Sequence, residues 1–181
     1  MAAVQNGDAK KVAELMRQDP GFNVNMAVDA YRCSTLHYAC QGDQRSAVLP
    51  LLLAHPDIDV NVKTTYGYTP FSYACDGHTS CVRLLLKDSR VEVNEPERWM
   101  ASGREMDLGE PGDIYVTDAI RKAKQRGYAE VVSLLERFKS DAAKTRSEVR
   151  KELGINGQYS DYYSIVFLFL FSFSVHKLLH F

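Results

Sequence analysis

The sequence predicts an all-α fold of stacked helix pairs, and three recurring features support this prediction. Two nine-residue stretches, which begin at Ser34 and Thr69, are nearly alike and lie 35 residues apart. Glycines recur at the same spacing, at Gly7, Gly42 and Gly77. Val-Asn pairs recur at a similar spacing and end at Asn25, Asn61 and Asn94. A period in the thirties is typical of helix-pair repeats, none of which can bury its apolar face alone.

The first helix pair is expected within residues 2–25. Asp8 precedes a run whose apolar residues follow helical spacing, and its carboxylate can cap the start of that helix. Polar residues between them, among them Lys11 and Glu14, give the pair a solvated outer side. A terminal repeat needs such a side because no neighbour covers it.

Residues 30–61 and 66–94 are expected to form the second and third pairs. In the third pair, Pro70 follows Thr69 as proline follows a helix cap, at a position where its missing N–H costs nothing. A glycine turn, which needs a residue without a Cβ atom, then leads into a longer helix. That helix contains three consecutive leucines in both pairs.

This order of features resembles the ankyrin-repeat family, whose pattern is Thr-Pro-Leu-His-x-Ala, a glycine turn, Val-x-x-Leu-Leu and Val-Asn. Thr69-Pro70-Phe71 and Thr35-Leu36-His37 each carry most of the opening, and neither carries all of it. The resemblance covers about residues 2–94 and 117–140. It therefore implies an ankyrin-repeat helical solenoid over residues 1–153.

The resemblance implies that the first helix of each pair lines a concave face and that the Val-Asn segments lead into hairpin fingers. These fingers are expected near 26–33, 62–68 and 95–98. His37 resembles the family's histidine, which braces neighbouring loops through hydrogen bonds. Members of the family mostly bind other proteins through the fingers and the concave face, so the expected function is that of a protein-binding adaptor.

Four finger residues are our candidates for anchors that bind the partner: Tyr31, Arg32, Tyr66 and Tyr68. At protein interfaces, a few aromatic or arginine side chains carry most of the binding energy. The alternative is that these side chains only pack the fingers against each other. The identity of the partner protein cannot be read from the sequence.

The repeat pattern breaks between Asn94 and the last copy. Only 14 residues separate Asn94 from Leu108, where a full period would need about 33. We interpret 95–116 as a degenerate remnant, produced by a deletion or a misjudged exon boundary, and the alternative is a tolerated long loop. In both cases the stack is expected to be weakest here.

Residues 117–153 are expected to form a C-terminal capping repeat. From Tyr128 the last outer helix is expected to run on to Leu153 or Glu152, and Gly154 is expected to end it. Its thin apolar stripe consists of Leu135, Phe138, Ala142, Thr145, Val149 and Leu153. Mixed charges fill the other positions, which indicates a helix that extends into solvent. A docking helix for a partner is the alternative.

Residues 154–181 form an irregular hydrophobic tail. A transmembrane helix needs about 20 predominantly apolar residues, and 162–181 reaches that length only by including serines, histidines and a lysine. The tail could be a membrane anchor or an adventitious strand. It could also be translated non-coding sequence, because pyrimidine-rich codons encode Phe, Leu and Ser. A membrane-tethered adaptor is therefore the alternative function, and it depends wholly on this tail.

No residue pattern indicates catalysis, a cofactor or a metal. No nucleophile has a base partner in view, and the glycines fit no nucleotide-binding fingerprint. The four cysteines are Cys33, Cys40, Cys75 and Cys81. They lack the paired spacing of a zinc site and are expected to be small, buried thiols. We therefore expect a protein that is not an enzyme.

The composition fits one elongated cytoplasmic domain. The chain has 181 residues, 45% of them hydrophobic, and a formal charge of −1 that gives no electrostatic argument for nucleic acid. Residues 1–4 run straight into polar residues, so no secretory signal is expected. The cysteines form no dense disulfide framework, which favours a reducing compartment. We expect a monomer in the cytoplasm, with the nucleus as the alternative compartment.

Overall fold

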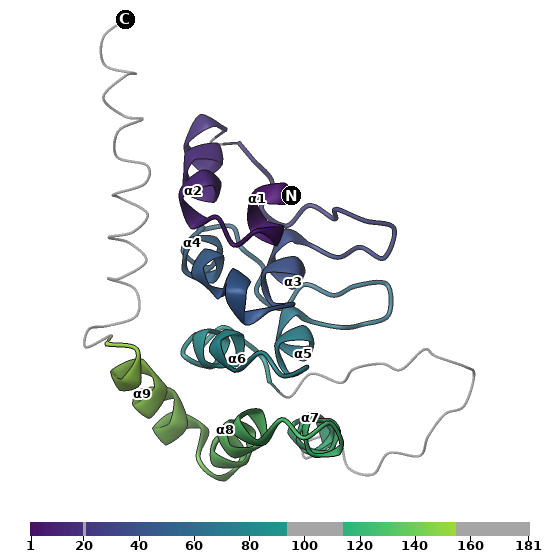
Figure 1. Ribbon diagram of the computed structural model, residues 1–181, viewed down its shortest axis with the longest axis vertical. Coiled ribbons are helices and arrows are strands. Elements are labelled where there is room, and N and C mark those ends of the chain that lie inside the picture. Colours follow the sequence, from purple (N-terminus) through teal and green to yellow (C-terminus); the bar gives the residue numbers. More distant parts are fainter. Residues whose placement is uncertain (20, 94–113, 155–181) are drawn as a thin grey trace, which may run out of the picture.

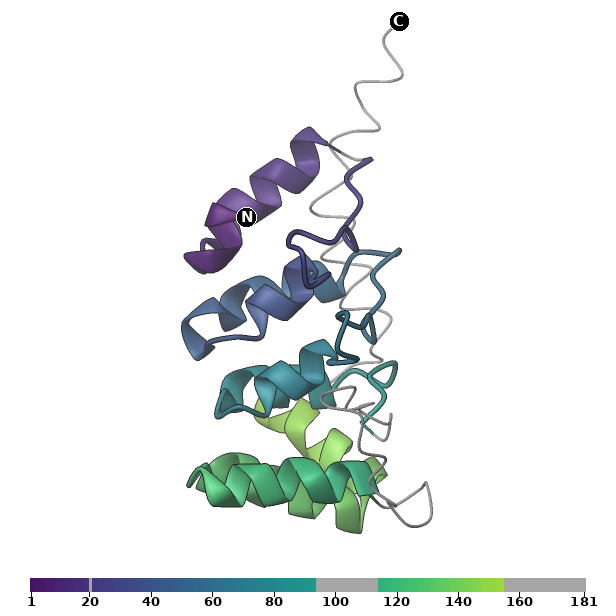
Figure 2. The ribbon, with the colours of Figure 1, turned by 90° about the vertical axis from the view of Figure 1, so that its right-hand side faces the viewer.

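The computed structural model describes residues 1–19, 21–93 and 114–154. Within these residues the helices stack as pairs into one solenoid (Figure 1), so the predicted all-α class is confirmed. Seen from the side of the fingers, the pairs form successive layers (Figure 2). No helix in the described part of the chain has the length and the apolar character needed to cross a membrane. The tail at 162–181 lies outside the described residues, so the membrane-anchor alternative is untested.

The helices of the described residues form four pairs followed by one further helix. Their bounds are α1 (Ala2–Gln5) and α2 (Ala9–Gln18); α3 (Thr35–Ala39), the 3-10 helix η1 (Asp43–Val48) and α4 (Leu49–Leu53); α5 (Pro70–Ala74) and α6 (Thr79–Leu86); α7 (Ile114–Gln125) and α8 (Ala129–Ser140); and finally α9 (Ala142–Glu152).

The first helices of the pairs form an inner layer and the second helices form an outer layer. In the inner layer α1 packs against α3, and α3 packs against α5. In the outer layer α2 packs against α4, α4 against α6, and α6 against α8. One continuous apolar core runs between the layers, and its fully buried side chains include Leu36, Leu52, Leu85 and Leu135. Burial of this apolar surface is the main force that holds the layers together.

The caps that the sequence predicts are present. The Asp8 carboxylate accepts a hydrogen bond of 2.9 Å from the Lys11 N–H and so satisfies one of the unpaired donors at the start of α2. At the start of α5, Thr69 and Ser72 bond each other's backbone N–H in a capping box.

The glycine turns follow the predicted phase with one exception. Gly77 has a φ of +100° and so needs a residue without a Cβ. A Cβ at this position would lie 2.8 Å from the Tyr128 ring. Gly42 has a φ of 176°, an extended conformation that any residue adopts. The expectation that Gly42 makes the same turn is therefore wrong, because the chain there leads directly into the 3-10 helix η1.

The last outer helix is interrupted, so the prediction of one unbroken helix from Tyr128 up to Gly154 is wrong. Asp141 leaves the helical conformation with a φ of −154° and a ψ of 95°, and it ends α8. Its carboxylate accepts a hydrogen bond of 2.9 Å from the Lys144 N–H and so starts α9. The preference of aspartate for this cap position explains the break.

Helix α9 folds back onto the stack instead of extending into solvent. It packs against both α8 and α6, and its two small inward side chains, Thr145 and Val149, are buried. Arg146 lies over the Phe138 ring, with its guanidinium carbon 5.0 Å from the ring centre.

Two arginines of α9 bond to backbone carbonyl groups at and beyond the C-terminal end of α6. Arg146 donates to the carbonyl oxygens of Leu86 (2.6 Å), Asp88 and Val91 (3.0 Å). Arg150 donates to the carbonyl oxygen of Lys87 at 3.0 Å. Carbonyl groups at a helix end have no partner within the helix and carry partial negative charge, so cations are favourable there.

Candidate functional site

The first finger, residues 26–33, is a hairpin that closes on the carboxylate of Asp29. This carboxylate accepts hydrogen bonds from the N–H groups of Tyr31 (2.9 Å) and Cys33 (2.8 Å). The Val28 N–H donates to the Cys33 carbonyl at 2.8 Å. Arg32, at the tip, has a φ of +60°, which is uncommon for a residue other than glycine.

The hydrogen bonds to Asp29 keep its carboxylate ionised. Partial burial acts to raise the pKa of Asp29, but the hydrogen bonds from the Cys33 and Tyr31 N–H groups and the Tyr38 hydroxyl outweigh it, so the pKa is lowered. The Tyr38 hydroxyl donates to the second carboxylate oxygen at 2.8 Å. The finger is thereby joined to the inner helix α3.

The second finger, residues 62–68, forms a similar hairpin. The Thr64 N–H donates to the Tyr68 carbonyl at 3.0 Å, and the Gly67 N–H donates to the Thr64 carbonyl at 3.0 Å. Gly67 has a φ of +82°, which glycine adopts without strain. The expected third finger, 95–98, lies outside the described residues.

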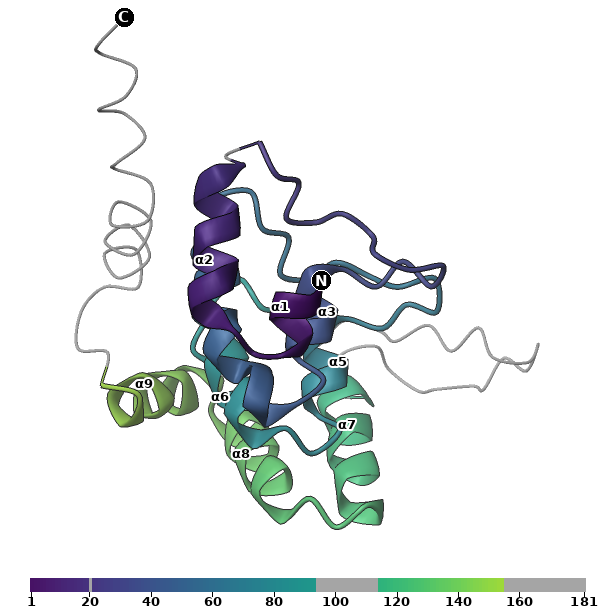
Figure 3. The same ribbon diagram turned by 45° about the horizontal axis from the view of Figure 1, so that its top comes forward.

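The two fingers lie side by side and leave the stack in the same direction, while α9 lies on the opposite side (Figure 3). The Thr65 N–H and hydroxyl both donate to the Tyr31 carbonyl, at 2.8 and 3.2 Å. The rings of Tyr31 and Tyr66 approach to 5.8 Å between centres, tilted by 33°. These contacts fix the two fingers relative to each other.

The bases of the fingers are joined by His37, as the resemblance implied. Its Nδ1 accepts a hydrogen bond of 3.0 Å from the Ser34 N–H, so the proton lies on Nε2, which donates to the Tyr68 carbonyl at 3.0 Å. Burial lowers the pKa of His37, and the imidazole is therefore neutral at pH 7.

The asparagines of the Val-Asn pairs join each repeat to the next. Asn25 donates to the Asp57 carbonyl at 2.6 Å and accepts from the Asp59 N–H at 2.8 Å. Asn61 repeats this pattern with the Arg90 carbonyl and the Glu92 N–H, at 2.8 and 2.9 Å. The recurrence of Val-Asn was visible in the sequence, but its role was not predicted from it.

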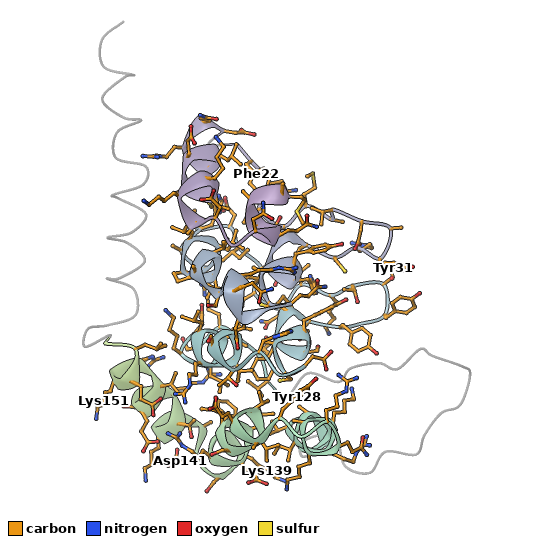
Figure 4. The ribbon with its side chains drawn as sticks, in the orientation of Figure 1. Phe22, Tyr31, Tyr128, Lys139, Asp141 and Lys151 are labelled. Atoms are coloured by element: carbon orange, nitrogen blue, oxygen red, sulfur yellow. The ribbon has the colours of Figure 1, made fainter. Side chains whose placement is uncertain are left out.

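The structure brings two of the four candidate anchors, Tyr31 and Tyr66, together at the finger tips. Tyr31 is 56% exposed and Tyr66 is 50% exposed, and Arg32, which follows Tyr31 in the chain, is also exposed. Figure 4 shows Tyr31 at the outer end of the fingers. Tyr68 is half-buried, with its ring edge-on to Tyr73 at 6.2 Å, so it also packs the base of its finger.

Sequence reasoning missed Met26, which is 49% exposed in the first finger. Its single signal was an apolar residue directly after a Val-Asn pair. We call Met26, Tyr31, Arg32 and Tyr66 the finger edge. Large exposed apolar side chains that lie on neighbouring hairpins are typical of surfaces that bind other proteins.

The four cysteines are buried inside the stack. Burial raises the pKa of Cys81 to about 12 and the pKa of Cys40 well above its usual range. A cysteine binds zinc as the thiolate, a form that these raised pKa values disfavour. Among the described residues, no group of three or more His, Cys, Asp or Glu side chains is placed to hold a metal ion.

A family model described as ankyrin repeats, in three copies, matches residues 1–96. The SMC5-SMC6 complex localization factor protein 1 of Bos taurus and that of Homo sapiens are each 44% identical to the chain over 55 residues. The protein of the same name from Mus musculus is 40% identical over 55 residues. These matches cover 30% of this chain and 5% of each relative.

Proposed function

Because the chain belongs to the ankyrin-repeat family, whose repeats are generally protein-interaction modules, we propose that it is a non-catalytic adaptor that binds a partner protein through the finger edge and the concave face of the inner helices. The observation that carries this proposal is the exposed pair Tyr31 and Tyr66, held in contact at the tips of two hydrogen-bonded fingers.

The rigidity of the fingers favours binding. Ordering a flexible loop on association costs free energy, and a surface already held in one conformation avoids much of that cost. Here the Tyr31 carbonyl, the Asp29 carboxylate and the His37 ring hold the fingers before any partner arrives. Tyrosines on such a surface offer a large contact area with few rotatable bonds.

The name of the relatives suggests a second and more specific candidate function. Their name describes a factor for localisation of the SMC5-SMC6 complex. We therefore keep a partner in the assembly of that complex, in the nucleus, as an alternative to a cytoplasmic partner. Separation of cytoplasmic and nuclear fractions in the experiment below distinguishes the two compartments.

The experiment is site-specific photo-crosslinking with the full chain. A photoreactive phenylalanine analogue is placed at Tyr66 and, as a matched control, at Leu15, which is 44% exposed on α2. Both chains are expressed in cells, irradiated, and separated into cytoplasmic and nuclear fractions. We expect a discrete crosslinked protein from Tyr66 and none of that size from Leu15. Equal products from both positions would contradict the finger edge as the binding surface.

The crosslinked partner then allows each anchor to be measured. Tyr66→Ala and Tyr31→Ala should weaken binding, with at least one of them losing about tenfold or more, because hot spots at interfaces are few and aromatic. The melting temperature should change little, since both side chains are half exposed. Loss of stability without loss of affinity would show that the tyrosines only pack the fingers.

A further inference from the structure

We propose that a pocket at the end of the helix stack takes a tyrosine ring from residues 159–163 of the chain's own C-terminal tail. The pocket lies on α7 and α8, the layer farthest from α1 and α2 (Figure 1). The segment 159–163 lies outside the described residues. The glycine turns of the repeats and the place at which α9 ends support this assignment, which is independent of the finger edge.

Two of the glycine turns with a positive φ are covered by the repeat that follows them. A Cβ on Gly7 would collide with the carbonyl oxygen of Gln44, in the 3-10 helix η1 of the second pair. A Cβ on Gly77 would lie 2.8 Å from the ring of Tyr128, which caps α8 of the fourth pair. The outer side of such a turn is therefore a surface on which the next layer rests.

The last turn of this kind, at Gly127, is uncovered within the described part of the chain. Its φ of +76° repeats the positive φ of Gly77, and it likewise precedes the cap of an outer helix. Apart from its chain neighbours, no described atom lies within 4 Å of a Cβ placed on Gly127. The turn instead borders a pocket of about 370 Å³. The surface that receives the Tyr128 ring at Gly77 thus has an open counterpart here.

The lining of the pocket suits an aromatic ring that carries one polar group. The Tyr128 ring, Ala129 and Val132 give it apolar walls. Lys124 and Glu136 also line it, joined by an ion pair of 2.6 Å, and they can donate to and accept from a hydroxyl. A tyrosine combines an apolar ring with a hydroxyl that takes a hydrogen bond when it is buried.

Helix α9 ends beside the helix that carries the pocket. The carboxylate of Glu152, in the last turn of α9, lies 3.6 Å from the guanidinium of Arg137 on α8. Arg137 directly follows Glu136, which lines the pocket. From Glu136 back to Ala129 the helix rises by about 10 Å. The tail therefore leaves the described part of the chain close to the pocket.

The tyrosines of the tail are near enough in sequence to reach the pocket. Tyr159, Tyr162 and Tyr163 follow Gly154 by five, eight and nine residues. At about 3.3 Å for each extended residue, these separations allow a reach of roughly 16–30 Å. A segment joined to its site by so short a stretch of chain binds at an effective concentration on the order of millimolar, which favours it over a separate partner.

The first test is photo-crosslinking within the purified full chain. A small amino acid with a diazirine group replaces Ser133, which is exposed and lines the pocket, or Ala143, which is exposed on α9. Ala143 is the matched control because it lies ten residues nearer to the tail in sequence. Mass spectrometry should find a crosslink from position 133 to residues 159–163, in a product with the mass of one chain, and little or none from position 143.

Other products would overturn the proposal. A product with the mass of two chains would assign the pocket to a second copy. A tail crosslink of equal yield from both positions would indicate random collisions, and the absence of a tail crosslink from position 133 would show that the tail does not occupy the pocket.

The second test measures how well the pocket is covered in the full chain. Ser133→Cys and Ala143→Cys each add one thiol, and the rate of its alkylation by a maleimide is followed. The four native cysteines are buried, and the unsubstituted chain serves as the blank. The thiol of Ser133→Cys should react at least about fivefold more slowly than that of Ala143→Cys, because a covered thiol reacts only when its cover opens. Equal rates would contradict the proposal.

Substitutions in the tail then identify the segment that provides the cover. In the Ser133→Cys chain, replacing Tyr159, Tyr162 and Tyr163 together by serine should raise the alkylation rate to that of Ala143→Cys. Replacing Phe167, Phe169 and Phe171 together by serine is the matched control and should leave the rate unchanged. Faster alkylation in the phenylalanine variant, or an unchanged rate in the tyrosine variant, would refute the role of residues 159–163.

Discussion

The joints among the first three helix pairs and the joint to the fourth pair are made by different chemistry. We call the joints among the first three pairs the upper joints. There, Asn25 and Asn61 join neighbouring repeats in the same way, and His37 adds a hydrogen bond between the finger bases. We call the joint between the third and fourth pairs the lower joint. There, the Tyr128 ring covers Gly77, and an ion pair joins Arg126 to Asp76. The arginines of α9 then hold the end of α6 from the outside.

This difference shows two ways to join layers of a solenoid. The upper joints use residues at fixed positions of the repeat, so each new repeat brings its own joint. The lower joint uses side chains outside the repeat pattern and draws on a helix that follows the last pair. Exposed ion pairs such as Arg126 with Asp76 contribute little to stability, so packing and the arginine–carbonyl bonds carry this joint.

The largest effect is expected where the lower joint is tightest. Gly77→Ala places a Cβ against the Tyr128 ring and strains a backbone with a φ of +100°, so we expect a loss of about 2–3 kcal/mol in unfolding free energy. Gly42→Ala is the control, because its backbone is extended and its close neighbour is the movable end of Gln44. Urea denaturation should show a cost at Gly42 of less than about 1 kcal/mol. Equal costs at both positions would contradict the difference between the two turns.

A smaller effect is expected from breaking one upper joint. Asn61→Ala removes two hydrogen bonds between repeats and leaves the Arg90 carbonyl and the Glu92 N–H without their partner, at a cost of about 1–2 kcal/mol. Asn23→Ala is the control, since among the described residues the Asn23 side chain bonds only to the Asn25 N–H, within its own turn. If both variants unfold at the same urea concentration, the hydrogen bonds of Asn61 between repeats contribute nothing beyond what a local turn contributes.

Loss of an arginine contact of α9 should mainly change how often this helix opens locally. Arg146→Gln removes bonds to the carbonyl groups of Leu86 and Val91, so hydrogen exchange of the α9 amides should become about tenfold faster. The amides of α3 and α5, in the upper layers, should exchange as in the wild type. Lys151→Gln, an exposed position of the same helix, should change neither region. Slower or unchanged exchange in α9 of Arg146→Gln would show that packing alone holds the helix.

The smallest effect concerns pH. Burial lowers the pKa of His37 below its unfolded value of about 6.5, so the folded protein binds this proton less readily than the unfolded chain. The stabilising contribution is complete above the unfolded pKa and declines as the pH falls towards the folded pKa. Thermal melting between pH 7 and pH 5 should show this decline, and His37→Gln should flatten it. Burial also lowers the pKa of His55, so the melting temperature of His37→Gln should still fall slightly as the pH is lowered. Parallel curves for variant and wild type would contradict the role of His37.

The upper layers could be predicted in detail because their determinants are local and periodic. The caps at Asp8 and Thr69 and the turn at Gly77 follow from local or recurring residues, and the bracing by His37 was implied by the resemblance to the ankyrin-repeat family. The candidate site could be predicted in part: the finger tips were located, but exposure separates Tyr31 and Tyr66 from the half-buried Tyr68. The exposure of these side chains depends on how two hairpins lie against each other. The sequence pattern of a single hairpin carries no information about that arrangement.

The fold of α9 could not be predicted for a related reason. Its stripe of Thr145 and Val149 was recognised, but a stripe this thin does not indicate which surface it covers. The bonds from Arg146 and Arg150 reach carbonyl groups far away in the sequence, and such contacts leave no local pattern. The break at Asp141 did have a signal, because aspartate is a preferred helix cap.

The docking of α9 also has a consequence for the order in which the chain folds. In a solenoid most contacts join residues close in sequence, so folding can begin in any repeat and spread to its neighbours. Arg146 instead contacts Leu86 and Val91, which lie 60 and 55 residues earlier. Closing so long a loop costs chain entropy, and only a finished α6 presents the carbonyl groups that compensate for it. We therefore expect α9 to dock in the last step of folding, after the layers that it fastens have formed.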